Sequence, residues 1–127
     1  MANRSDGRPK LKILSAFEKL AMVGRTFEHT DFDRVDFSMA NLRLARFVHV
    51  SLQGCDFSRA DLRGSVFVAC DLRGAVFLQT RLADNRFDGS WFVGTRGLSV
   101  AQQQYVRARG GLFLSLATAP PPPSKPD

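Results

Sequence analysis

Apolar residues recur at every fifth position through the middle of this chain. An α-helix repeats its apolar positions about every 3.6 residues and a strand every 2, so a sustained period of five fits neither element alone. The period indicates a short strand followed by a corner, repeated many times. The predicted core ladder contains only Phe and Leu: Phe27, Phe32, Phe37, Leu42, Phe47, Leu52, Phe57, Leu62, Phe67, Leu72, Phe77, Leu82, Phe87 and Phe92.

A second column, two residues before each ladder position, consists mostly of small residues such as Ala40, Ala60 and Ala75. Residues two apart in a strand face the same side, so both columns are expected to point inward. One large and one small side chain together fill a narrow interior without voids. Outward and corner positions hold most of the Asp, Arg, Gln and Gly residues.

A longer period of twenty residues lies on top of the first, because Phe27, Phe47, Phe67 and Phe87 occupy equivalent positions. Four five-residue sides then make one coil, and equivalent residues stack about 4.8 Å apart, the spacing of paired strands. This pattern predicts an all-β solenoid of about 3.5 coils, in which each coil contacts its neighbours.

Several segments resemble the A-(D/N)-L-x-x units of the pentapeptide-repeat family, namely Ala40-Asn41-Leu42, Ala60-Asp61-Leu62-Arg63-Gly64 and Cys70-Asp71-Leu72-Arg73-Gly74. The resemblance implies a right-handed quadrilateral β-helix. It implies little about function, because the family is functionally mixed. Some members resemble duplex DNA in shape and charge and bind type II topoisomerases such as gyrase.

The chain divides into five predicted segments. They are a flexible basic arm (1–10), an N-terminal capping helix (11–24), the repeat β-helix (25–97), a C-terminal capping helix (98–111), and an apolar run with a Pro-rich disordered tail (112–127).

The predicted N-terminal helix rests on the helical spacing of Ile13, Phe17 and Leu20, which forms an apolar stripe. We expect this stripe to cover the open end of the first coil, and a helix offered to a partner or a membrane surface is the alternative. The C-terminal helix is expected to begin after Ser99 and to stop at Gly110.

The net charge of +6 is concentrated in the terminal segments. Residues 25–96 contain ten Arg and nine Asp or Glu, so the repeat block is nearly neutral. Mimicry of DNA requires dense negative charge, so a gyrase-binding protection or immunity protein is an alternative that this balance disfavours. Nucleic-acid binding by the basic termini is a second alternative, also disfavoured because no aromatic residues are interleaved with a basic groove.

No constellation of catalytic residues or cofactor-binding motif is present, so we expect a protein that is not an enzyme and has no cofactor. His29 and His49 lie twenty residues apart and should stack, but zinc requires at least one further ligand, so no metal is expected. Cys55 and Cys70 should be free, buried thiols, as in a reducing compartment. With no signal peptide and no long apolar segment, we expect a cytoplasmic protein without a membrane span.

The most informative departures from the repeat are apolar residues at outward positions. They form the candidate interaction patch: Val48, Val66, Val68, Ala69, Val76, Leu78, Trp91 and Val93. An exposed apolar patch usually marks an interaction site, and in a homodimer it is self-complementary. The sequence therefore favours a non-enzymatic interaction or scaffold module with an unidentified protein partner, a homodimer being one form. The alternative is that residues 112–117 cover the patch.

Overall fold

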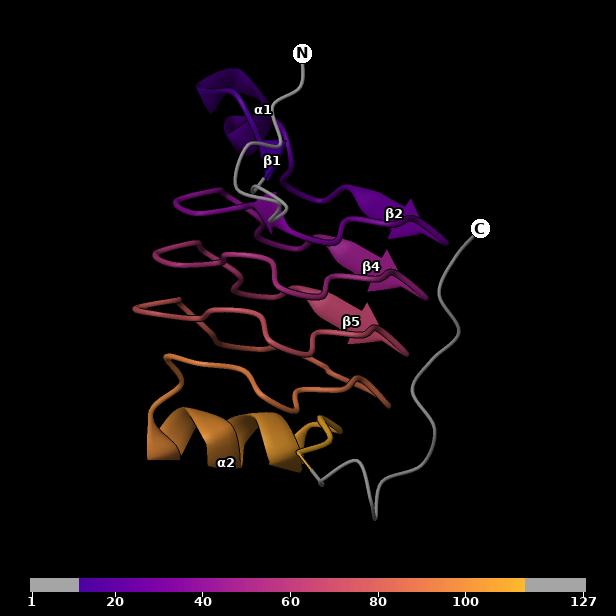
Figure 1. Ribbon diagram of the computed structural model, residues 1–127, viewed down its shortest axis with the longest axis vertical. Coiled ribbons are helices and arrows are strands. Elements are labelled where there is room, and N and C mark those ends of the chain that lie inside the picture. The colour runs from indigo at the N-terminus through magenta and orange to yellow at the C-terminus, as the bar shows by residue number, and fades with distance from the viewer. Residues whose placement is uncertain (1–11, 114–127) are drawn as a thin grey trace, which may run out of the picture.

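The structure is a computed structural model, and it describes residues 12–113, apart from the side chains of Lys12 and Phe17. Three short strands, β2 (Thr26–Glu28), β4 (Arg46–Val48) and β5 (Val66–Val68), lie one above another in Figure 1 and pair in parallel. Phe27 pairs with Phe47 and Phe47 with Phe67, so the pairing offset is the twenty-residue period of the sequence.

Parallel bridges with the same offset connect the other three sides of each coil. Each side is named by three residues, a ladder residue and the outward residue on either side of it. The four sides are side I (26–28, 46–48, 66–68, 86–88), side II (31–33, 51–53, 71–73, 91–93), side III (36–38, 56–58, 76–78) and side IV (41–43, 61–63, 81–83). Backbone pairing therefore runs between coils, and the side chains of the ladder are left to fill the interior.

The Phe and Leu ladder forms the hydrophobic core. Phe57 is fully buried, and its ring stacks between those of Phe37 and Phe77, at centroid distances of 5.2 and 5.3 Å. Phe27, Phe32 and Leu82 are the partly buried members of the ladder, and all three lie in the first or last coil. Burial of each large apolar side chain contributes about 1.5–3 kcal/mol, so the stack supplies the main stabilisation of the coils.

Each corner of the coil is a tight turn with a left-handed residue. The Ala40 N–H donates to the Phe37 carbonyl at 3.0 Å, and the turn places Met39 at a φ of 62°. The same geometry recurs every five residues, and nine of these corner residues are not glycine. Asp side chains at the outward positions support the turns, because Asp36 Oδ1 accepts the Ser38 N–H at 2.8 Å.

The helix predicted over residues 11–24 is wrong in extent. Strand β1 (Lys12–Ile13) pairs with β3 (Val35–Asp36), and helix α1 covers only Ala16–Leu20. The reason is a capping box: the Glu18 N–H donates to Ser15 Oγ at 3.1 Å, and the Ser15 N–H donates to Glu18 Oε1 at 2.8 Å. A helix cannot continue back through its own cap, so the preceding residues pair with the edge of the first coil instead.

The apolar stripe expected of that helix is also not buried as a whole. Ile13 and Leu20 are 81% and 69% exposed, whereas Met22, which follows the helix, packs into the core. The exposed Leu20 therefore becomes part of the outer surface.

The last coil is covered by helix α2 (Val100–Ala108) and the segment after it (Figure 1). Ser99 and Gln102 form the capping box that starts α2, and Val106 is fully buried beneath the coil. After the helix, Phe92 N–H donates to the Leu112 carbonyl at 2.7 Å, and the Phe113 ring lies 5.5 Å from that of Phe92.

Phe113 thus adds one more ring below the ladder on side II, twenty-one residues after Phe92. Within the apolar run predicted at 112–117, the described residues Leu112 and Phe113 lie below Trp91 and Phe92, away from sides I and III. The arm at 1–10 and the tail from 114 onward lie outside the described residues. Neither helix in the described range is long and apolar enough to cross a membrane.

Candidate interaction surface

The structure divides the candidate patch between opposite sides of the solenoid. Val48, Val66, Val68 and Ala69 belong to side I and the corner after it, and all four are half-buried. Val76 and Leu78 belong to side III, where Leu78 is 55% exposed. These residues therefore do not form one continuous surface.

The expectation that Trp91 is exposed is wrong, because its side chain is only 2% accessible. The Arg73 guanidinium lies over the indole, 5.2 Å from the ring centroid. Asp71 holds that guanidinium in place by accepting hydrogen bonds from Arg73 Nε at 2.8 Å and Nη2 at 2.6 Å. Val93, two residues further on the same side, is half-buried. Side II therefore offers an ion pair stacked on an aromatic ring in place of an apolar patch.

Larger apolar exposure occurs at two corners that the sequence patch did not include. Met39 is 69% exposed and Leu44 is 59% exposed, and the two corners bound side IV of the first coil. The sequence patch considered only outward positions within the sides. The sequence signal that could have found them is a large apolar residue at a corner position, because most other corners hold Gly, Arg, Gln, Asp or His.

Helix α1 brings a third apolar side chain to the same region. Leu20 and Met39 line a shallow hollow of about 370 Å³ together with Leu14, Ala16 and Lys19. The helix is attached to side IV because the Asn41 N–H donates to the Lys19 carbonyl at 3.0 Å. We call Leu20, Met39 and Leu44 the corner surface.

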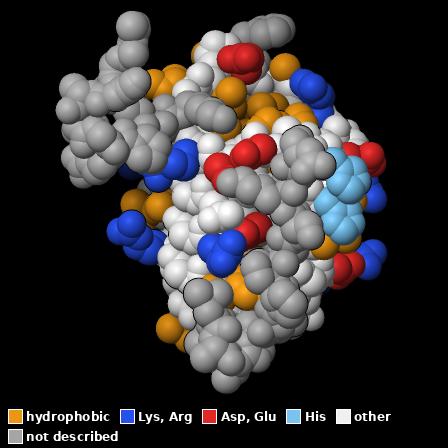
Figure 2. All heavy atoms as spheres, turned by 45° about the vertical axis from the view of Figure 1, so that its right-hand side comes forward, with side chains coloured by type: hydrophobic (Ala, Val, Ile, Leu, Met, Phe, Trp, Pro, Cys, Tyr) orange, Lys and Arg blue, Asp and Glu red, His pale blue; other side chains and the backbone are white. Residues whose placement is uncertain are grey.

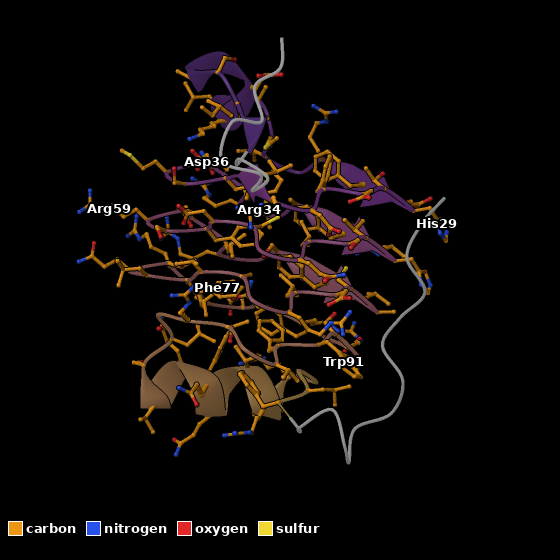
Figure 3. All side chains as sticks on the ribbon, in the orientation of Figure 1. His29, Arg34, Asp36, Arg59, Phe77 and Trp91 are labelled. Carbon is orange, nitrogen blue, oxygen red and sulfur yellow. The ribbon has the colours of Figure 1, made fainter. Side chains whose placement is uncertain are left out.

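Lys19 makes two polar contacts with side III at the edge of this surface next to α1. Lys19 Nζ donates to Ser38 Oγ at 3.3 Å and lies 3.8 Å from Asp36 Oδ1. Asp36, labelled in Figure 3, lies on side III, and Met39 stands at the corner that follows that side. The charge of Lys19, which lines the hollow together with Leu20, is thus already compensated by Asp36.

The two histidines stack as the twenty-residue spacing predicts. The rings of His29 and His49 lie 5.1 Å apart and nearly parallel, and they form one continuous strip on the surface in Figure 2. Among residues 12–113, no group of three or more His, Cys, Asp or Glu side chains is placed to hold a metal ion.

Cys55 and Cys70 are free and buried thiols, as predicted. Burial, as the largest cause, raises the pKa of Cys55 to about 12 and that of Cys70 to about 11. Cys55 Sγ donates to the Phe32 carbonyl at 2.9 Å, and Cys70 Sγ donates to the Phe47 carbonyl at 3.2 Å. Both thiols therefore act as small core residues with a hydrogen bond between coils.

Both thiols should react with iodoacetamide at pH 8 at least about 100-fold more slowly in the folded chain than in urea, because only the thiolate is nucleophilic. The raised pKa values favour the protonated thiols in the folded state. Their contribution to stability is therefore complete below about pH 8.5, the unfolded value, and is lost as pH rises toward 11–12. Mass spectrometry of alkylated protein checks the rates, and rapid labelling of native protein would contradict the burial.

Comparison with known proteins places these observations in a family. The family model described as "Pentapeptide repeats" matches eight copies, over residues 26–47, 40–77 and 60–96. A search of curated protein sequences gives no significant match.

Two solved structures illustrate the similarity. One is a pentapeptide repeat protein from the thylakoid lumen of Arabidopsis thaliana, with a TM-score of 0.61 and 25% identity over 75% of this chain and 59% of that one. The other is the plasmid-mediated fluoroquinolone resistance protein QnrB1, with a TM-score of 0.47 and 28% identity over 68% of this chain and 46% of that one. The chain thus spans about half to three-fifths of the length of these proteins. From its matched repeats and its twenty-residue coils, the chain belongs to the pentapeptide-repeat family, whose fold is a right-handed quadrilateral β-helix.

Proposed function

We propose that this pentapeptide-repeat chain is a non-enzymatic protein-interaction module that acts through its outer surface, with a second copy of the chain as its partner. Pentapeptide-repeat proteins are generally structural or interaction modules, which agrees with this proposal. The observation that carries it is the exposure of Met39 and Leu44 at two neighbouring corners.

The fold itself gains little from large apolar side chains at these corners. Met39 and Leu44 have φ values of 62° and 61°, and the left-handed conformation costs a residue with a Cβ about 1–2 kcal/mol. Glycine adopts this conformation without that cost, as Gly64 does in the coil below Leu44. The corner geometry does not require the apolar side chains of Met39 and Leu44, and association with another protein surface would give these exposed groups a partner.

A second copy suits the corner surface because a two-fold axis lets the same patch cover itself. Leu20, Met39 and Leu44 would then be buried in both copies. Lys19 at the edge is compensated by Asp36, so its burial in the contact leaves no bare charge there. These features support self-association more directly than the half-buried valines of side I.

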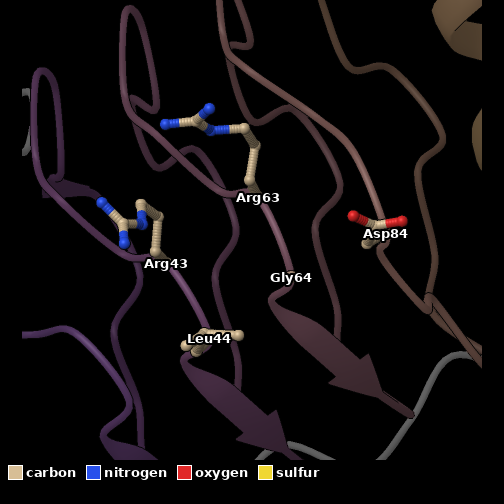
Figure 4. A pocket seen from close by; sticks show the side chains of 5 residues that line it. All are labelled: Arg43, Leu44, Arg63, Gly64 and Asp84. Carbon is tan, nitrogen blue, oxygen red and sulfur yellow. The ribbon is translucent and has the colours of Figure 1, made fainter.

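The topoisomerase-binding alternative has less support. Residues 25–96 contain ten Arg and nine Asp or Glu, whereas a DNA mimic needs a dense array of negative charge. Arg43 and Arg63 also project from side IV in Figure 4, where a mimic would carry acidic groups.

Replacing Leu44 by aspartate should weaken self-association at least about tenfold, because a charge would be buried in the proposed contact. Sedimentation equilibrium from micromolar to several hundred micromolar protein measures the change. Val66→Asp on strand β5 is the matched control, since it adds the same charge outside the corner surface and should leave association unchanged.

Circular dichroism of both variants should match that of the unaltered chain, because Leu44 and Val66 both project outward. A chain that stays monomeric across the concentration range would overturn the choice of partner. Loss of association in Val66→Asp alone would move the contact to side I.

A further inference from the structure

We propose that a hollow on side IV is a binding site for an oxyanion, a carboxylate or a phosphate, held between Arg43 and Arg63. The hollow has a volume of about 530 Å³ and is lined by Arg43, Leu44, Arg63, Gly64 and Asp84. These residues come from three consecutive coils, as Figure 4 shows. The proposal goes beyond the interaction role and concerns the monomer, because Leu44 belongs both to this hollow and to the corner surface.

The first argument is that Arg43 has no carboxylate partner within residues 12–113, whereas the equivalent arginines of other sides and coils, Arg63 and Arg73, each have one. Arg63 and Arg73 each follow an aspartate by two residues and form two hydrogen bonds with it. Arg43 occupies the same position after Asn41, whose neutral amide oxygen accepts only the Arg43 backbone N–H, at 3.4 Å. Among the described residues, no ion pair of the Arg43 side chain is found.

The second argument is that the two arginines are adjacent and that one is already fixed. Asn41 and Asp61 bridge in parallel, and the Leu44 N–H donates to the Arg63 carbonyl at 3.1 Å. Arg43 and Arg63 therefore start from neighbouring strands about 4.8 Å apart. Arg63 donates Nε to Asp61 Oδ1 at 2.8 Å and Nη2 to Asp61 Oδ2 at 2.7 Å, which leaves its Nη1 group for a ligand. Planar guanidinium groups match the oxygens of carboxylates and phosphates.

The third argument concerns the space between them. Gly64 stands at the corner between Leu44 and Asp84, and a Cβ on this residue would lie 2.7 Å from Leu44 Cδ2. The missing side chain therefore keeps the hollow open while Leu44 forms an apolar wall. The hollow is open to solvent, so the two arginines and not burial supply the attraction for an oxyanion.

The local charge balance favours an anion of low charge. Arg43, Arg63 and Asp84 line the hollow, and Asp61 pairs with both Arg63 and Arg81, so these five groups together carry one positive charge in excess. Arg81 Nη1 lies 3.9 Å from Asp61 Oδ2, so Asp61 is shared by two arginines. Asp84 lies beyond Arg63, one coil further along, and would repel a second negative group on the same ligand (Figure 4).

The test is a nuclear magnetic resonance titration of the full chain with inorganic phosphate and, separately, with acetate, at constant ionic strength. The Nε–H signal of Arg43 should shift and saturate, because the Arg63 Nε–H is already bonded to Asp61 and only its Nη1 group is left for the ligand. Arg73 and Arg86 are internal controls, since each donates to an aspartate of its own side and neither lines the hollow. Saturation by phosphate alone would identify a phosphate group as the ligand, saturation by acetate alone would identify a carboxylate such as an acidic side chain, and equal saturation would show a site for either oxyanion.

Asn41→Asp is the decisive variant, because it gives Arg43 the same carboxylate partner that Arg63 and Arg73 have. It should lower the affinity for the anion at least about tenfold while leaving the fold intact. Gln104→Glu on α2 adds the same charge at a distance and should leave the affinity unchanged. The proposal is overturned if Arg43 does not respond, if all arginines shift alike without saturation, or if Asn41→Asp binds as the unaltered chain does.

Discussion

Replacing Phe57 by alanine should lower the free energy of unfolding by about 3–5 kcal/mol, the range typical of a fully buried phenylalanine. The Phe57 side chain has no exposed area, and it lies between the stacked rings of Phe37 and Phe77. Its ring is also edge-on to that of Phe67, at 6.4 Å. Neighbouring coils are fixed by backbone pairing on four sides, so the cavity cannot collapse. Urea denaturation followed by circular dichroism measures the loss.

Phe57→Leu is the matched control, because leucine occupies the same ladder position on sides II and IV. It should cost less than about 1.5 kcal/mol if the interior accepts either shape. Equal losses for the two variants would show that stacking between aromatic rings, and not the volume of the side chain, stabilises side III. No loss in Phe57→Ala would contradict a packed interior.

Asn85→Ala should destabilise the chain by about 2–4 kcal/mol and should loosen helix α2 first. The buried Asn85 Nδ2 donates to the Leu62 carbonyl at 2.6 Å and to the Ser65 carbonyl at 3.0 Å. Its Oδ1 accepts the Tyr105 hydroxyl at 3.1 Å, which connects the coil to the helix. Removing the amide leaves several buried groups unpaired, each costing about 1–3 kcal/mol before relaxation. Hydrogen exchange of the α2 amides measures the local effect.

Tyr105→Phe separates the two roles of this network. It removes only the hydroxyl, which also accepts the Asn85 N–H at 2.8 Å, and retains the ring 6.4 Å from Phe87. We expect a cost of about 1–2 kcal/mol and faster exchange in α2, with the coils unchanged. Faster amide hydrogen exchange in the coils of Asn85→Ala than in the unaltered chain, with no change in α2, would contradict this view. The network would then stabilise the coils and not their junction with the helix.

The ladder, the small inward column and the twenty-residue offset could be predicted because each depends on a strict repeat. Phe57 and Ala60, for example, are both fully buried, as their places in the two columns require. The ends could not be predicted in the same way, because each end contains a single copy of its contacts. The Ser15–Glu18 cap shortens one helix, and Phe113 returns to the ladder only after α2 has displaced it from the five-residue register.

The outer surface was the least predictable part. Trp91 stands at an outward position, yet its burial involves Arg73 of the preceding coil, eighteen residues earlier, which Asp71 holds in place. Met39 and Leu44 stand at corners, whose backbone geometry is fixed by the turn while their side chains are left unconstrained. A repeat specifies which residues point inward, and it specifies much less about what covers those that point outward.

The segment after α2 also limits how this chain can assemble. Phe87 donates to the Arg109 carbonyl, and Leu112 donates to that of Ser90, so hydrogen-bonding groups on two sides of the final coil are already used. Head-to-tail stacking of solenoids into a filament requires a free edge at both ends of each molecule. On those two sides, a neighbouring molecule could pair with the final coil only by displacing the segment after α2. Strand β1 and the Lys19 carbonyl likewise occupy backbone groups of the first coil, so both described ends of the solenoid offer fewer free groups for strand addition than a bare coil would.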